Sequence, residues 1–209
     1  MADPTTPKTA PNAKSKIGLK NMVVAPIVKD TEEELEYGPL QLVAGSIEAS
    51  ISPENADADV QYADDVEWDA LYPDPEITFN TTLVDLPLVL QSEILGHKLD
   101  DNGVLVKSDA DKPSYYAVGF KSEKSDHTYR YVWLYKVRAK PITENFGTKE
   151  GSTINRQTQE VEWTAVKRIH DGRYQAVADE GENGFTAEKG KEFLKSVYTP
   201  SFTAVTPNP

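Results

Sequence analysis

Residues 114–139, SYYAVGFKSEKSDHTYRYVWLYKVRA, place the strongest constraint on the fold, because they predict two long strands joined by the polar run KSEKSD. In the second strand two sets of side chains alternate, as they do on the two faces of a strand. One face carries Tyr129, Tyr131, Trp133, Tyr135 and Val137, and the opposite face carries Val132 and Leu134 at its centre. A strand that is apolar on both faces needs packing partners on both sides. The hairpin therefore predicts a β-sandwich or a closed sheet built around it.

The net charge of −12 is concentrated in one block of the chain. Residues 30–76 contain fifteen Asp and Glu and no Lys or Arg, whereas the rest of the chain contains nineteen acidic and twenty-two basic residues. Because such a block repels phosphate, it disfavours stable binding of nucleic acid. Two interpretations fit this pattern: a solvated acidic face, and a wall along which nucleic acid slides without adhering.

Residue types that carry much of enzyme chemistry are scarce. The sequence has no cysteine, which excludes disulfides, thiol catalysis and thiolate metal sites. Its three histidines, at positions 97, 127 and 170, are far apart, and it has no glycine-rich phosphate loop, nucleophile elbow or dinucleotide-binding fingerprint. We therefore expect no enzymatic activity, no catalytic site and no cofactor.

One acidic stretch keeps a metal site in consideration. Asp57, Asp59, Asp64 and Asp65 lie close together and offer the oxygen ligands that Ca²⁺ prefers, but they lack the spacing of an EF-hand. The thirty-four acidic residues are also compatible with a glycosidase carboxylate pair, although no motif indicates one. We predict no metal site and leave calcium binding by this loop open.

The chain as a whole predicts one mainly β domain, residues 17–198, between two arms. Residues 1–16 and 199–209 are rich in proline and lack hydrophobic periodicity, so we expect both arms to be disordered in an isolated subunit and fixed between subunits. No apolar run approaches the roughly 20 residues of a membrane span, and the start of the chain lacks the apolar block of a secretory signal. We therefore expect synthesis in a cytosol and no membrane association.

Between the arms, the pattern predicts eight to ten strands and two short helices. Strands are expected at residues 19–28, 39–51, 60–71, 76–84 and around 161–165. Residues 86–95 predict an amphipathic helix that Asp85 caps and Gly96 ends, and residues 187–198 predict a second helix capped by Thr186. Asn102-Gly103 and Asp171-Gly172 predict tight hairpin turns.

The predicted strand 60–71 is acidic on one side only. Val66 and Trp68 alternate with Asp65, Glu67 and Asp69, the pattern of a strand with one buried face and one wet face. We therefore expect Trp68, like the other two tryptophans, to point inward, and the acidic side chains to face water.

Five segments together resemble the major tail proteins of long-tailed phages, in particular the phi13-type family. The segments run from about residue 17 to residue 200 in the family's order, and the similarity rests on this co-linear set, since no single motif is diagnostic. They are IGLKNMVVAPI, LVAGSIEASISPENADADVQYADD, EILGHKLDDNGVLVKSD, RYVWLY and FLKSVYTP.

The resemblance implies a tail tube protein with a β-sandwich or barrel fold and one or two short flanking helices. Such a structural virion protein would form homohexameric rings that stack into a tube in the host cytoplasm, together with tape-measure and tail-terminator or tail-tip proteins. DNA would pass through the lumen without specific binding. We expect the acidic residues Asp65, Glu67 and Asp69 to face the lumen. We expect contacts with the adjacent ring from Ser52, Pro53, Glu54, Asn55, Asp57 and Asp59.

Two other function classes remain open at this point. A monomeric carbohydrate-binding β-sandwich would use Trp68, Trp133 or Trp163 as a stacking platform, and would require these rings to be exposed beside polar groups. An enzyme would require a deep pocket that holds two carboxylates with strongly shifted pKa values.

Overall fold

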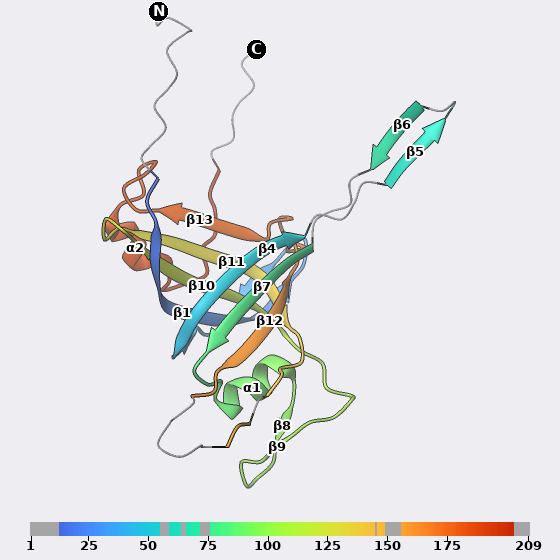
Figure 1. Ribbon diagram of the computed structural model, residues 1–209, viewed down its shortest axis with the longest axis vertical. Helices are drawn as coiled ribbons and strands as arrows, with labels where there is room; N and C mark the ends of the chain where they lie inside the picture. Colours follow the sequence, from blue (N-terminus) through green and yellow to red (C-terminus); the bar gives the residue numbers. More distant parts are fainter. Residues whose placement is uncertain are drawn as a thin grey trace, which may run out of the picture.

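The computed structural model describes residues 13–54, 59–63, 66–71, 76–144, 146–148 and 156–202. Within these ranges the chain forms thirteen strands and two short helices (Figure 1). The helices are α1 (Leu88–Leu95) and α2 (Ala187–Phe193). The strands are β1 (Lys16–Asp30), β2 (Leu35–Tyr37), β3 (Gln41–Val43), β4 (Ser46–Glu54), β5 (Asp59–Ala63), β6 (Val66–Leu71), β7 (Glu76–Leu83), β8 (Lys98–Leu99), β9 (Leu105–Val106), β10 (Tyr115–Lys124), β11 (Tyr129–Ala139), β12 (Gln159–Ala165) and β13 (Gln175–Asp179).

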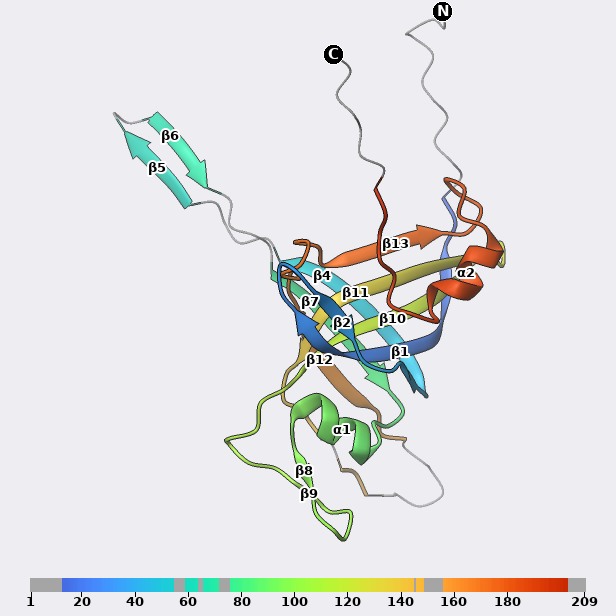
Figure 2. The ribbon, with the colours of Figure 1, turned by 180° about the vertical axis from the view of Figure 1, so that it is seen from behind.

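Nine strands form one antiparallel sheet that folds over on itself. Its order is β2-β1-β10-β11-β12-β7-β4, with β3 added to β1 and β13 added to β11. β4, β7 and β12 pack across β1, β10 and β11, as the two opposite views show (Figures 1 and 2). The architecture is therefore the predicted mainly β sandwich with two short flanking helices, and the described strands do not close into a barrel.

The predicted central hairpin is confirmed as β10 and β11. Its second strand is buried on both sides, with Leu134 in the larger apolar cluster and Trp133 in a second cluster beneath α2. The prediction that Val137 shares the aromatic face is wrong. A β-bulge between the pairs Tyr116–Val137 and Val118–Leu134 shifts the alternation, so Val137 packs in the larger cluster.

One strand, β11, belongs to both layers of the sandwich. Its first half pairs with β13 from Arg130 to Leu134, and its last residues, Val137 to Ala139, pair with β12. The Asp171-Gly172 turn forms as predicted, but β12 and β13 do not pair with each other, as a simple hairpin would require. The two strands instead diverge from the same side of β11, which opens the sandwich at this side.

The second helix is confirmed with its predicted cap, since the Thr186 hydroxyl accepts a hydrogen bond from the Lys189 N–H. Gly190 lowers the helix propensity of this segment by about 1 kcal/mol relative to alanine. The structure gives the reason for glycine here: a Cβ at position 190 would collide with the hydroxyl of Tyr131. Glycine therefore allows α2 to lie directly on the aromatic face of β11.

Three further sequence expectations are corrected. The expected strand at 39–51 is split into β3 and β4 by a turn at Gly45, whose φ of 76° favours glycine. The expected strand at 60–71 is two strands, β5 and β6, which form a separate hairpin. α1 begins after Pro87 with no side-chain cap, so Asp85 is not its N-cap, although Gly96 ends the helix in the left-handed conformation as predicted.

Candidate subunit-interaction surfaces

Four strands of the main sheet, β2, β3, β4 and β13, each pair with a single strand in the part of the chain that the structure describes, and β4 and β13 are the longest of them. β4 pairs with β7 alone, and β13 pairs with β11 alone. An unpaired edge presents N–H and C=O groups that can continue the sheet with a strand of another chain. The edges of β4 and β13 are therefore candidate surfaces for pairing between chains.

The edges of β4 and β13 border one groove of about 700 Å³, whose lining combines apolar side chains with Lys16, Glu48 and Arg130. Core side chains, among them Phe120 and Val132, form its floor, and Ile47 of β4 and Val177 of β13, each 52% exposed, lie on its rims. The groove lies where β12 and β13 diverge from the same side of β11. Apolar interior that reaches the surface in this way is typical of a face that another molecule covers.

Partly buried ion pairs link β13 to β10 and β11. The Arg130 guanidinium donates to the Asp179 carboxylate through Nε (2.7 Å) and Nη2 (2.5 Å), and the Nζ of the buried Lys124 lies 3.1 Å from the same group. The hydrogen bond from Arg130 lowers the pKa of Asp179, and Lys124 adds to this effect against the opposing influence of burial. Asp179 therefore stays ionised and holds β13 in place at neutral pH.

The turn before β13 is held by a fully buried arginine. The Arg168 guanidinium stacks 3.7 Å from the ring centre of Tyr135, and its Nε donates to Asp171 over 2.9 Å. Burial alone would raise the pKa of Asp171, but the hydrogen bonds from Arg168 and Arg173 outweigh it and lower the pKa. The edge strand thus begins from a rigid turn.

The outward face of the sheet of β4, β7 and β12 is polar and acidic. In register, Glu48 lies beside Thr82 and Glu160, and Ser50 lies beside Asn80 and Glu162. These residues are exposed, except for the partly buried Thr82. Lys140 forms an ion pair with Glu162 at the border of this face. The face therefore carries an excess of carboxylates over ammonium groups.

Sequence reasoning did not identify this face as a candidate site. A signal was present, since Glu160 and Glu162 alternate with the buried Val161 and Trp163. The alternation shows that one side of β12 is wet, but only the pairing of β12 with β7 and β4 shows that its carboxylates form one surface with Glu48.

The sequence-predicted site residues that the structure describes lie in the β5–β6 hairpin and at the end of β4, the strand of the main sheet that precedes it. Glu67 and Asp69 are in β6, opposite Tyr62 and Gln61 of β5, and Asp59 begins β5. Ser52 and Pro53 are exposed residues at the end of β4, which Glu54 completes. Asn55, Asp57 and Asp65 lie outside the described residues, as does most of the acidic loop considered for calcium.

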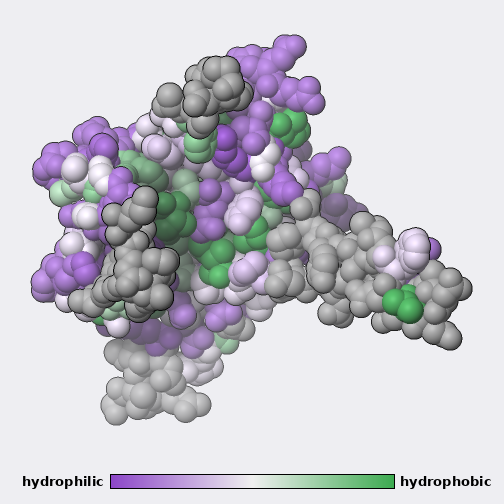
Figure 3. Space-filling model, turned by 90° about the horizontal axis from the view of Figure 1, so that it is seen from above, coloured by the Kyte–Doolittle hydropathy of each residue, from purple (hydrophilic) through white to green (hydrophobic). Residues whose placement is uncertain are grey.

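The expectation that Trp68 points inward is wrong. Trp68 is 75% exposed and Val66 is 63% exposed, because the β5–β6 hairpin projects from the body (Figures 1 and 3) and pairs with no other described strand. Trp133 and Trp163 are buried as expected, at 0% and 2% exposed.

The described residues contain no cluster of three or more side chains that could hold a metal ion. The Nδ1 atoms of His97 and His127 lie 2.7 Å from Asp111 and 3.0 Å from Glu123, in two separate pairs of which the first is partly buried. None of the described helices is long and apolar enough to cross a membrane. The distinctive features of this part of the molecule are therefore its open edges, its polar sheet face and its projecting hairpin.

Comparison with known proteins gives one finding. The family model for the phage tail tube protein matches residues 43–200, which is well over half of the chain. The match begins at the end of β3 and includes β4, the hairpin, both helices and β13. No curated protein matches the chain.

Proposed function

The chain belongs to the phage tail tube protein family, and from this premise we propose that it polymerises as stacked hexameric rings that form the conduit for genome delivery. The family is structural rather than enzymatic, and its members are virion tail components that assemble into a tube with other tail proteins. The assignment to the phi13-type branch of the family remains a prediction from the resemblance. The proposal below concerns how this particular chain would make a ring and a lumen.

The open edges of β4 and β13 are the observation that carries this proposal. Each edge can accept a strand from a neighbouring copy, and the groove between them would be covered in the same step. A lateral contact that uses one side of each copy against a different side of the next is heterologous, and it closes into a ring when the rotation per copy divides a full turn. Six copies would close the ring proposed here.

Carboxylates would line the lumen. We assign the outward face of β4, β7 and β12 to the lumen, with Asp65, Glu67 and Asp69 of the hairpin as further lumen candidates. Fewer contacts between cations and phosphates weaken DNA binding, so a wall of this charge would let DNA pass without adhering.

The remaining partners follow from the same proposal. Ser52, Pro53, Glu54, Asn55, Asp57 and Asp59 would lie near the adjacent ring, because in the sequence they join the end of β4 to the start of the projecting hairpin. Tape-measure and tail-terminator or tail-tip proteins would set the length and the ends of the tube. Assembly would take place in the host cytoplasm, without a membrane partner.

Electron microscopy of the purified protein at high concentration, together with sedimentation velocity, tests the proposal. We expect rings or hollow tubes with sixfold end views, and species larger than the 23.2 kDa chain that increase with concentration. Addition of tail-tip protein provides an initiator if growth is slow. A chain that remains monomeric with and without this initiator would contradict the proposal.

The exposed Trp68 favours one alternative, a carbohydrate-binding module. Trp133 and Trp163 are buried and cannot form a platform, so this function would depend on Trp68 alone. A glycan array with the wild-type protein and with Trp68→Ala separates the two functions. Glycan binding that Trp68→Ala abolishes, in a protein that does not assemble, would support the alternative.

A further inference from the structure

The chain contains two Asn-Gly dipeptides, Asn102-Gly103 in the turn between β8 and β9 and Asn183-Gly184 in the turn between β13 and α2. Asparagine followed by glycine is prone to spontaneous deamidation, because glycine has no Cβ to hinder attack of its backbone nitrogen on the asparagine side chain. The reaction needs a free glycine N–H and an asparagine carboxamide that can turn toward it. The folded structure therefore decides which of the two asparagines reacts.

The β8–β9 turn has hydrogen bonds on both reacting groups. The Gly103 N–H donates to the Asp100 carbonyl oxygen over 3.0 Å. The Asn102 carboxamide donates through Nδ2 to the Asp100 carboxylate over 3.2 Å. The same carboxylate accepts the backbone N–H groups of Asn102 (2.9 Å) and Val104 (2.8 Å). Attack on Asn102 therefore requires several hydrogen bonds to open first.

The β13–α2 turn leaves both reacting groups unpaired within the part of the chain that the structure describes. No described group forms a hydrogen bond with the Gly184 N–H or with the Asn183 carboxamide. Both residues are exposed, and a Cβ at position 184 would meet no atom within 4 Å. Attack on Asn183 therefore requires no hydrogen bond to open.

The backbone of Asn183 also favours opening of the turn. Its φ of 49° lies in the left-handed region, which is less stable for asparagine than for glycine. Asn102 does not adopt this conformation, since Asn21, His127 and Asn183 are the described residues other than glycine with a positive φ. Asn183 is therefore the less restrained of the two asparagines in its backbone as well as in its side chain.

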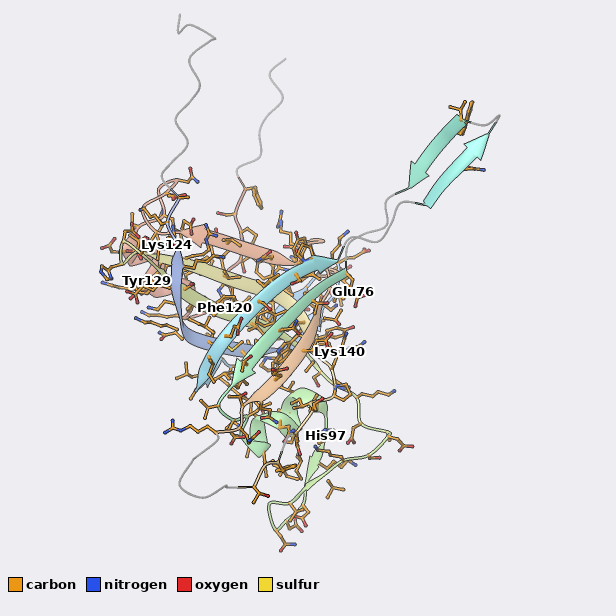
Figure 4. All side chains as sticks on the ribbon, in the orientation of Figure 1. Glu76, His97, Phe120, Lys124, Tyr129 and Lys140 are labelled. Carbon is orange, nitrogen blue, oxygen red and sulfur yellow. The ribbon has the colours of Figure 1, made fainter. Side chains whose placement is uncertain are left out.

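The two turns lie in different parts of the molecule, so each reaction can be followed independently. In Figure 4, Tyr129 marks the end of the sheet beside the β13–α2 turn, since its carbonyl accepts a hydrogen bond from the Glu180 N–H over 2.9 Å. His97, which directly precedes β8, marks the region of the β8–β9 turn.

We propose that Asn183 is a site of spontaneous deamidation in the folded protein and that the fold protects Asn102. The Gly184 nitrogen attacks Cγ of Asn183, the N–Cγ bond forms, and the Cγ–Nδ2 bond breaks. The side-chain nitrogen leaves as ammonia and takes the proton of the Gly184 amide. Water then opens the resulting succinimide at either carbonyl group, which gives aspartate or isoaspartate. The reaction takes place within one subunit and consumes only water, so the inference goes beyond the proposed function and does not depend on it.

The modification changes the charge and the geometry of the surface around α2. Asn183 lines an open groove of about 830 Å³ that also carries Glu188, Lys189 and Glu192. Either product adds a carboxylate to this lining. Isoaspartate also lengthens the backbone by a methylene group between the edge strand β13 and α2. A subunit that has reacted therefore differs from a fresh one on this surface.

Peptide mapping by mass spectrometry after incubation at mildly alkaline pH tests the proposal. In the folded protein we expect Asn183 to deamidate on the order of tenfold faster than Asn102, because the hydrogen bonds of the β8–β9 turn must open first. In protein unfolded in urea the two rates should be similar, since the dipeptide is the same. A folded protein in which Asn102 reacts as fast as Asn183, or a ratio of rates that unfolding leaves unchanged, would overturn the proposal.

Three variants separate the contributions of the two turns. Asn183→Gly removes the carboxamide and keeps a residue that favours the left-handed conformation, so the acidic shift on isoelectric focusing should disappear. Asn102→Gly is the matched control and should leave that shift unchanged.

Asp100→Ala removes the carboxylate that holds the Asn102 carboxamide, and should raise the deamidation rate of Asn102 several-fold. An unchanged rate at Asn102 in this variant would contradict the protection by the fold. An acidic shift that persists in Asn183→Gly would contradict the assignment to Asn183.

Discussion

The body of the molecule and its β5–β6 hairpin both consist of strands with alternating side chains, but tryptophan is buried in the body and exposed in the hairpin. In the body, Trp133 and Trp163 are buried between layers of the folded sheet. In the hairpin, Trp68 alternates with charged residues just as Trp163 does, yet it is 75% exposed. The difference shows that an alternating strand buries its apolar face only where a second layer exists, and no described strand other than β5 pairs with β6.

Substitution of Trp133 is expected to have the largest effect on the stability of the subunit. Its ring lies on Gly119, where a Cβ would come within 2.8 Å of it, and its Nε1 donates to the Phe193 carbonyl over 2.8 Å. Trp133→Ala should lower the free energy of unfolding by about 3–5 kcal/mol, measured by urea denaturation of the monomer. Trp68→Ala is the matched control and should change it by about 0.5 kcal/mol or less. Equal effects would show that the hairpin packs on its own body.

A smaller effect is expected where α2 lies on the body. Gly190→Ala should destabilise the subunit by about 1–3 kcal/mol, since the added methyl group collides with Tyr131, although alanine is the better helix former. Lys191→Ala, at an exposed position of the same helix, controls for propensity and should be nearly neutral. Thermal unfolding measures both variants. A stabilised Gly190→Ala protein would mean that α2 does not touch β11 in solution.

Charge reversal compares the two regions as lumen candidates. Glu160→Lys with Glu162→Lys alters the main sheet face, and Glu67→Lys with Asp69→Lys alters the hairpin. Each pair should allow tubes to assemble but reduce genome delivery, measured as infectious particles per tube, by about tenfold or more, because new cation–phosphate contacts retain DNA. Unimpaired delivery by one pair would remove that region from the lumen.

We expect pH to have a modest effect on the stability of the body of the molecule. The pKa of Asp179 is lowered in the folded state, so its pairing with Arg130 and Lys124 stabilises the fold above the ordinary pKa of 3.8. This stabilisation is lost as the pH falls and the carboxylate becomes protonated. Asp179→Asn should therefore be less stable than the wild type at neutral pH and should lose less stability on acidification, as urea denaturation at several pH values would measure. Parallel pH profiles would contradict this role.

Removal of the hairpin is expected to have the smallest effect on the stability of the subunit. Glu54 and Glu76 face each other in register, so residues 55–75 can be replaced by Asn-Gly, the favoured two-residue turn. The free energy of unfolding of the monomer should change by about 1 kcal/mol or less, because the hairpin adds little to the core. Stacking of rings should be lost. Growth of normal tubes by this variant would show that the hairpin is dispensable.

The sequence allowed prediction of elements whose partners are local. The hairpin of β10 and β11, the alternation of β12 and the Thr186 cap of α2 are all confirmed, since each depends on residues within about twenty positions. The bulge that places Val137 on the opposite face of β11 was not predictable, because it depends on pairing geometry rather than on residue type.

The candidate surfaces were less predictable than the fold. The groove combines β4 with β13, which are more than a hundred residues apart, so no local pattern indicates it. The exposure of Trp68 was also hidden, because the alternation of an apolar and an acidic face is the same whether the apolar face packs within the chain or against another chain. The resemblance to tail proteins pointed to assembly, but it did not indicate which side chains are left uncovered.

The position of β11 in both layers has a mechanical consequence. A pull on β13 reaches β11 at Arg130 to Leu134, passes along its backbone to Val137, and enters β12, β7 and finally β4 through consecutive sheet pairs. The load path from one open edge to the other therefore consists of covalent backbone and hydrogen bonds, with no flexible loop in series. In a ring joined at these edges, each subunit would resist stretching along the circumference of the ring, such as stretching caused by the outward pressure of passing DNA.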